Sequence, residues 1–220
     1  MITKEKISVI LPTCNRYPVC RENVENVLRQ DYPNFEVIVC DDSDLDYNKA
    51  NAAGFLEFVR AEPRVKYLYT ARFDRDGKKD YGLARARNFG IIQSTGEYLV
   101  FLDDRMTPDN PNVLKLFAQW LSKGDKVWYF GDKGAQKTSF VENFSAICRH
   151  RVIDAGMFCE RIDKYGAMTR ELHGRFSRQG FTFKYLPEVV GRQVCKSTGW
   201  DKKDKEIPEM RKFLEHLFSR

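Results

Sequence analysis

The feature that most constrains this chain is the alternation of short apolar runs with helical patterns along its first 130 residues. Runs of β-branched and aromatic residues, typical of buried strands, occupy residues 7–11, 35–40, 65–69, 98–102 and 126–130. Between them, apolar residues recur at helical spacing within residues 20–28, 52–59, 83–93 and 113–121. Strand and helix in alternation predict right-handed crossovers, and therefore an α/β fold with a mostly parallel central sheet between flanking helices.

The second half of the chain is less regular, but the whole length of 220 residues suits a single domain. Residues 144–149 and 182–186 predict two more strands, and residues 172–179 predict a helix that ends at Gly180. Residues 207–220 form an amphipathic pattern whose apolar face carries Met210, Phe213, Leu214, Leu217 and Phe218. Such a helix can pack on the domain, lie on a membrane surface or bind a partner, and the sequence leaves these alternatives open.

Composition narrows the class of function. The chain has 37 Lys and Arg against 31 Asp and Glu, and this mild net charge of +6 suits an acidic ligand or an anionic membrane surface. The basic residues are scattered, so we expect no nucleic-acid partner. The six cysteines have no metal-ligand spacing, and no apolar run is long enough for a membrane span or an export signal. We therefore expect reduced thiols in a cytoplasmic protein, free or peripheral to the membrane.

Polar residues follow three of the predicted strands, at positions 12–13, 41–42 and 103–104. Ligands of parallel sheets bind beyond the carboxyl ends of the strands, so we expect these groups to converge on one rim. Carboxylates at the end of a buried strand are costly unless they meet a cation, a donor or water. A divalent metal that bridges diphosphate oxygens is a common solution in nucleotide chemistry. In addition, Arg87 lies in a predicted helix near this rim, and Arg can bind phosphate with paired hydrogen bonds.

Three stretches carry a resemblance to a known family: ISVILPTCNR, LRQDYPNFEVIVCDDSD and GLARARNFGIIQSTGEYLVFLDDR. The last is the most specific, with A-R-N-x-G, G-E-Y and F-L-D in one register. On these motifs, which cover most of residues 1–105, the chain resembles family 2 of the GT-A glycosyltransferases. A weaker similarity to the acceptor-side segment of the family follows in GMFCERIDKYG and RELHGRFSRQGFTFKYLP.

The resemblance implies a GT-A, Rossmann-like fold with a nucleotide-binding half (residues 1–105), an acceptor-side half (106–206) and the C-terminal helix (207–220). It implies transfer of a sugar from a nucleotide-diphosphate donor, UDP- or GDP-sugar above all, to a hydroxyl of a glycan, lipid-linked or protein acceptor. Inversion at the sugar is expected and retention remains open. The alternative is a non-catalytic relative that binds a nucleotide or glycan or scaffolds a partner. Nucleotidyl transfer is disfavoured because PTCNRYP lacks the glycines of a phosphate loop.

The same resemblance implies which residues form the site. The nucleotide-binding set is Pro12, Thr13, Asn15, Arg16, Asp41, Asp42, Arg87, Asn88, Asp103 and Arg105. Asp103 and Asp104 match the carboxylate motif that holds Mn²⁺ or Mg²⁺. Asp42, with Asp41, matches the acceptor for the N–H groups of the base, which suits uracil or guanine because a carboxylate only accepts hydrogen bonds.

The chain departs from the family pattern after the metal motif. The third position of the carboxylate motif is Arg105, which cannot bind a metal. Its charge could stand where the metal would and neutralise the leaving diphosphate. Alternatively, Asp103 and Asp104 hold the ion alone, or Arg105 simply pairs with Asp109.

A second departure concerns the general base. The acidic pair of the family's acceptor side is replaced by Met168 and Thr169, and Thr cannot act as a base at neutral pH. Glu171 is the nearest carboxylate along the chain and is our candidate for the catalytic base. On a helix it would lie ~200° round from residue 169, so a surface or helix-terminal charge is the competing interpretation.

Overall fold

The computed structural model describes residues 5–70, 82–134, 139–162 and 167–194. These residues form an eight-stranded sheet, in which the strands lie in the order β3-β2-β1-β4-β7-β6-β8-β5. Its strands are β1 (Ile7–Thr13), β2 (Phe35–Asp41), β3 (Val65–Tyr69), β4 (Tyr98–Leu102), β5 (Met106–Pro108), β6 (Val127–Asp132), β7 (Phe144–Cys148) and β8 (Thr182–Gln193). The predicted helix over residues 207–220 lies outside the described residues.

The first four strands form the parallel part of the sheet: β1 pairs with β2 and β4, and β2 pairs with β3. The predicted α/β fold with a mostly parallel sheet is therefore confirmed. Beyond β4 the pattern changes, because β7 runs antiparallel to both β4 and β6, and β5 runs antiparallel to β8. We expected neither reversal, because a buried strand carries the same apolar pattern in both directions.

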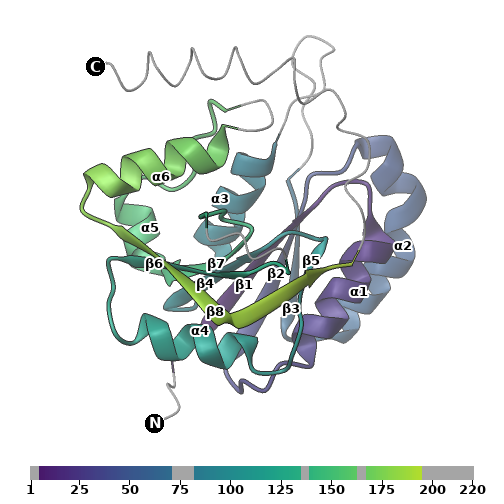
Figure 1. Cartoon of the computed structure of the whole chain (residues 1–220). Helices are drawn as coiled ribbons and strands as arrows, with labels where there is room; N and C mark the ends of the chain where they lie inside the picture. Colours follow the sequence, from purple (N-terminus) through teal and green to yellow (C-terminus); the bar gives the residue numbers. More distant parts are fainter. Residues whose placement is uncertain (1–4, 71–81, 135–138, 163–166, 195–220) are drawn as a thin grey trace.

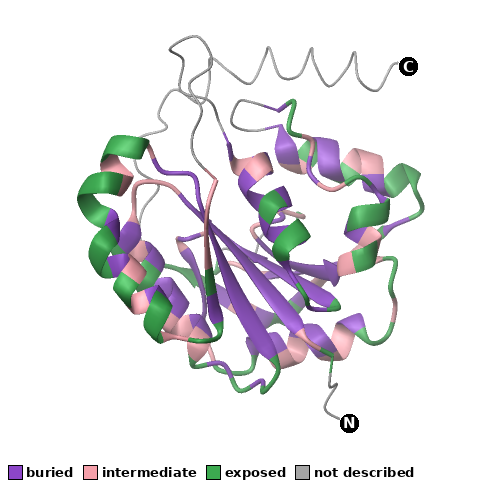
Figure 2. Cartoon of the chain, turned by 180° about the vertical axis from the view of Figure 1, so that it is seen from behind, coloured by how far each residue is buried: buried purple, intermediate pink, exposed green. Residues whose placement is uncertain are grey.

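Within the described part of the chain, six helices cover the two faces of the sheet (Figure 1). They are α1 (Tyr17–Leu28), α2 (Leu45–Ala61), α3 (Leu83–Gln93), α4 (Val113–Leu121), α5 (Arg149–Asp154) and α6 (Met168–Arg178). One core cluster joins the sheet to α1, α2 and α4, and the other joins it to α3, α5 and α6. Figure 2 shows the result, a buried sheet between helices whose exposed residues face outward. Within the described residues, Cys20, Cys40, Cys148 and Cys159 carry free thiols.

Some boundaries differ from the predicted ones. The helix predicted over residues 172–179 begins earlier, at Met168, whereas α4 begins at Val113, as its apolar pattern indicates. The backbone N–H of Asn112 donates to the Asn110 side chain at 3.0 Å, which holds a turn before α4. The short elements β5 and α5 were not predicted, because three to six residues carry too little periodicity to detect.

The close approach of α3 to the sheet depends on Gly90. A Cβ atom on Gly90 would lie 2.7 Å from Cys40 Sγ and 2.8 Å from Ile10 Cγ2, inside van der Waals contact. Glycine therefore lets the helix lie directly against β1 and β2. This packing fixes how deeply the neighbouring residues of α3, including Arg87, are buried in the protein.

We predict that Gly90→Ala lowers the free energy of unfolding by about 1–3 kcal/mol, because the added methyl forces α3 away from the sheet. Gly54→Ala is the matched control, since it also lies within a helix but its Cβ would meet nothing within 4 Å. That control should be neutral or stabilise by up to about 1 kcal/mol. Equal effects in chemical denaturation would contradict the proposed contact.

Candidate functional site

The carboxyl ends of β1, β2 and β4 form the predicted rim. Thr13 ends β1, and its Oγ1 donates to Oδ2 of Asp104 at 3.0 Å. The Arg16 guanidinium, at the start of α1, lies 3.0 Å from Oδ1 of the same carboxylate. Burial raises the pKa of Asp104 to about 6, although the charge of Arg16 opposes this shift. Both oxygens of Asp104 therefore already have partners within the protein.

The loop after β1 is tied to the loop after β2. Asn15 adopts a left-handed backbone with a φ of 55°, a conformation that Asn tolerates better than most residues. Its backbone N–H donates to Ser43 Oγ at 2.8 Å, and its side chain exchanges hydrogen bonds with Asp44. Pro12 is buried within β1. Two of the predicted nucleotide contacts, Pro12 and Asn15, thus also shape the rim.

The two aspartates at the end of β2 have different surroundings. Asp41 is fully buried and accepts hydrogen bonds from the hydroxyls of Tyr17 at 2.6 Å and Tyr67 at 2.5 Å. Burial and the Asp41 carboxylate raise the pKa of Tyr17 to about 12, so this phenol stays a donor. Asp42 instead accepts from Arg85 at 2.9 Å and from Thr70 at 3.2 Å. Asn48 of α2 also donates to Asp41 at 3.2 Å, so Asp41 holds helices α1 and α2 on the sheet, whereas Asp42 belongs to the α3 side.

Arg87 is fully buried, although we expected it to contact a nucleotide. Its guanidinium donates to Asp103 Oδ1 at 3.0 Å and to Glu142 Oε1 at 2.8 Å. It also stacks over the ring of Phe158, 5.1 Å from the ring centroid. Arg87 thus joins two carboxylates beneath the rim, and its contact with a nucleotide stays a prediction.

Asn88 is likewise bound by groups of the protein. It is buried, its Nδ2 donates to the Phe158 carbonyl at 2.9 Å, and its Oδ1 accepts from the Phe158 N–H at 2.9 Å. A further hydrogen bond of 2.8 Å reaches Glu160. These contacts fasten the loop after α5 to α3, so they give Asn88 a structural function.

Glu142 was missed by sequence analysis. It lies in the loop before β7, and its second carboxylate oxygen accepts a short hydrogen bond from the hydroxyl of Thr169. Burial alone would raise the pKa of Glu142, but the Arg87 charge and the hydrogen bond from Thr169 lower it below its ordinary value. The side chain is therefore an ionised carboxylate at neutral pH. Glu142 belongs to no recognisable motif, and only the fold brings it to Arg87.

Asp103 and Asp104 turn to different partners, although we expected them to share a metal ion. Asp103 binds Arg87 through one oxygen and accepts from Asn143 Nδ2 at 2.8 Å through the other. Lys133 donates in turn to Asn143 at 2.9 Å. Within the described residues, no three His, Cys, Asp or Glu side chains form a metal-ligating group.

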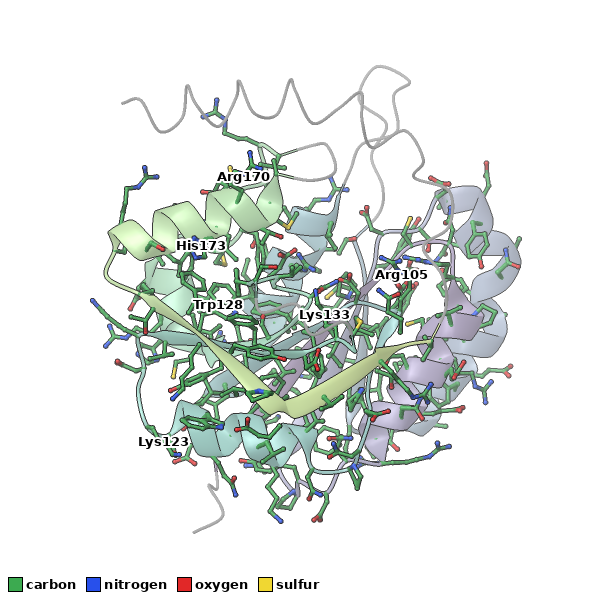
Figure 3. All side chains as sticks on the ribbon, viewed as in Figure 1. Arg105, Lys123, Trp128, Lys133, Arg170 and His173 are labelled. Atoms are coloured by element: carbon green, nitrogen blue, oxygen red, sulfur yellow. The ribbon has the colours of Figure 1, made fainter. Side chains whose placement is uncertain are left out.

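Arg105 lies in the turn between β4 and β5, close to the rim. Among the described residues its guanidinium has no hydrogen-bond or ion-pair partner, and Asp109 lies 3.6 Å from Arg192 instead. Figure 3 shows Arg105 and Lys133 above the sheet in the middle of the molecule, whereas Arg170 and His173 lie along α6. The alternative in which Arg105 pairs with Asp109 is therefore wrong.

Glu171 is turned away from these groups. Only 2% of its side chain is exposed, and it accepts from Arg175 Nε at 2.6 Å. Arg175 also donates to the carbonyls of Ala155 and Met157. The Glu171 carboxylate is therefore held in an ion pair within α6, and Arg175 fastens this helix to the loop after α5. The expectation of a catalytic base at Glu171 stays a prediction.

Solved structures share this architecture. A mannosyltransferase from Pyrobaculum calidifontis, in complex with GDP-Man and Mn²⁺, superposes with a TM-score of 0.71 at 21% identity, over 90% of this chain and 59% of that one. S. aureus TarS residues 1–349, in complex with UDP-GlcNAc, gives 0.67 at 18% identity, over 88% and 60%. The fold is the GT-A fold of nucleotide-diphospho-sugar transferases.

Sequence comparison identifies the family. The model of glycosyl transferase family 2 matches residues 8–181, and the chain belongs to this family. An uncharacterized glycosyltransferase of Rickettsia felis is 35% identical over 86% of this chain and 24% of its own length. A β-1,3-glucosyltransferase of Campylobacter jejuni that acts on GalNAc(5)-diNAcBac-PP-undecaprenol is 30% identical over 61% and 45%. The chain thus spans less than half the length of these curated relatives.

We predict that Glu171→Gln lowers the free energy of unfolding by about 1.5–3 kcal/mol, because it breaks a buried, charge-assisted hydrogen bond. Glu25→Gln is the matched control: Glu25 also pairs with an arginine four residues away, but on the surface of α1. Its loss should cost about 0.5 kcal/mol or less. Chemical denaturation measures both, and equal costs would contradict a structural function for Glu171.

Proposed function

We propose that this chain transfers a sugar from a nucleoside-diphosphate donor to an acceptor hydroxyl. The observation that carries the proposal is that Asp42, Asp103 and Asp104 follow the carboxyl ends of β2 and β4, on the same edge of the sheet, in a member of glycosyl transferase family 2. Ligands of open α/β sheets bind at this end of the strands. Carboxylates there can accept hydrogen bonds from the base and ribose, while cations nearby face the diphosphate.

For the donor, we propose a UDP- or GDP-sugar. Two structural neighbours hold GDP-Man and UDP-GlcNAc, which supports this choice. Asp42 would accept hydrogen bonds from N–H groups of the base. Thr13, Arg16 and Asp104 form a buried polar cluster beside it, suited to the ribose.

For the diphosphate, we propose Arg105 and Asp103. Arg105 supplies a permanent charge that can bind phosphate oxygens with paired hydrogen bonds. Mn²⁺ or Mg²⁺ fits Asp103 in chemistry, because such ions often bind through a single carboxylate together with substrate phosphates and water. Asp103 is 18% exposed, whereas Asp104 is 1% exposed and bound to Thr13 and Arg16, so Asp103 would be the protein ligand. When bound, the ion would offset the charge of the leaving diphosphate.

For the acceptor, we propose a glycan hydroxyl, carried on a lipid in the manner of the undecaprenol-linked substrates that two relatives are named for. The acceptor oxygen attacks the anomeric carbon as the bond to the diphosphate oxygen breaks, in a single displacement with inversion. Among the residues that the structure describes, no helix has the length and apolar character needed to cross a membrane. Contact of the C-terminal segment, residues 207–220, with a membrane surface is part of this proposal.

We predict that Asp42→Asn weakens binding of UDP or GDP by about 10- to 100-fold, because it replaces a charged acceptor facing the base. Asp46→Asn, an exposed aspartate on α2, is the control and should leave affinity unchanged. Isothermal titration calorimetry with both nucleotides makes the measurement. Native affinity in a folded Asp42→Asn protein would exclude Asp42 from the base site.

We predict that Arg105→Ala weakens binding of UDP or GDP by at least 10-fold and leaves binding of uridine or guanosine unchanged, since only the diphosphate meets the guanidinium. Arg192→Ala, which removes an exposed arginine paired with Asp109, should change neither affinity. Repeating the native titration with excess chelator tests the ion: affinity should fall if Asp103 holds a metal, and persist if Arg105 takes its place. A uniform loss for nucleoside and diphosphate would contradict the assignment of Arg105.

A further inference from the structure

The position at which the family carries its acceptor-side acid holds Thr169, and the structure places a different carboxylate beside it. We propose that Glu142, from the loop before β7, is the general base that takes the proton of the acceptor hydroxyl. The inference rests on the proposed transferase function and deepens it, because it assigns the base of the same site to a residue outside the family's motifs.

The contacts of Glu142 carry the first step. The Thr169 hydroxyl, in the first turn of α6, donates to Oε2, and Arg87 donates to Oε1 at 2.8 Å. An acid at position 169 would extend its carboxylate into the space that Glu142 now occupies. The negative charge that the family carries on α6 is thus supplied here by the loop before β7.

The second step of the argument is that Glu142 lies close to the carboxylate proposed for the donor. One nitrogen of the Arg87 guanidinium binds Glu142 and the other binds Asp103, so a single planar group separates the two carboxylates. Asn143, the neighbour of Glu142, donates to the same Asp103 at 2.8 Å. If Asp103 faces the donor diphosphate, Glu142 lies next to the reacting sugar.

Two other carboxylates of this half are placed differently. Glu171 is paired with Arg175 within α6, and Glu160 lies on the surface, where it accepts from Asn88 rather than from Arg87 or Thr169. Glu142 keeps 7% of its side chain accessible, and Thr169 beside it is partly exposed, so both lie where the interior meets the site. A carboxylate oxygen accepts two hydrogen bonds, and Oε2 has accepted one, so a place remains for the acceptor hydroxyl.

The chemistry balances without another reactant. The acceptor O–H proton passes to Oε2 of Glu142 while the acceptor oxygen forms its bond to the anomeric carbon. The bond from that carbon to the diphosphate oxygen breaks, and the diphosphate leaves with the electron pair. Arg87 keeps the pKa of Glu142 below its ordinary value, so the base is ionised before the acceptor arrives.

The experiment removes the carboxylate at position 142 and, in a second variant, places one at position 169. UDP-glucose and GDP-mannose are the donor probes: calorimetry measures their binding, and release of UDP or GDP measures turnover with water as the acceptor. Glu142→Gln should bind the donor within about threefold of the native protein and release nucleotide at least 100-fold more slowly, since positioned bases contribute roughly 10²–10⁴-fold. Thr169→Asp, added to Glu142→Ala, should recover at least a tenth of the native rate. Glu25→Gln, on the surface of α1, is the control and should keep the native rate.

The outcomes separate the two claims. Native protein that binds neither donor would overturn the proposed function, and the assignment of Glu142 with it. Donor binding with native turnover in Glu142→Gln would overturn the assignment alone, as would donor binding by native protein without turnover. If Glu142→Gln does not fold, the double variant decides: a rate no higher than that of Glu142→Ala, in a folded protein that binds donor, overturns the relocated base.

Discussion

The structure depends on one buried cation. Arg87 is fully enclosed, and a guanidinium taken out of water must be compensated by charges and hydrogen bonds. Asp103 and Glu142 provide that compensation from opposite directions, one after β4 and the other before β7. Because α3 lies directly on the sheet at Gly90, Arg87 is held at a fixed depth. The same contacts that satisfy the cation therefore orient Asp103 and Glu142, the carboxylates that we propose for the donor and the acceptor.

The neighbouring aspartates follow from strand geometry. Successive side chains of a strand point to opposite faces of the sheet. At the end of β2, Asp41 meets Tyr17 on the α1 face and Asp42 meets Arg85 on the α3 face. In the turn after β4, Asp104 binds Arg16 and Asp103 binds Arg87, so the two carboxylates of each adjacent pair have different partners. Each pair instead joins the two helical layers to one rim.

Sequence alone predicted the sheet, its principal strands and the rim, because these depend on apolar periodicity and on where strands end. The separate partners of Asp103 and Asp104 are Arg87 and Arg16, which no local pattern marks, and a metal ion shared by the two carboxylates stays a prediction. Helical periodicity indicated that Glu171 faces away from position 169, and Glu171 pairs with Arg175 whereas Thr169 binds Glu142. Sequence could not reveal Glu142, because its contact with Arg87 spans 55 positions and no local pattern marks it.

The central claim is that one buried guanidinium couples Asp103 to Glu142, and a double-mutant cycle tests it most directly. The free energy of unfolding would be measured for Asp103→Asn, Glu142→Gln and the double variant. We predict that the double variant loses more stability than the sum of the two single variants, by about 0.5–3 kcal/mol, because only the double leaves Arg87 without a compensating charge. Losses that add to within about 0.3–0.5 kcal/mol would contradict the account, since independent residues behave in that way.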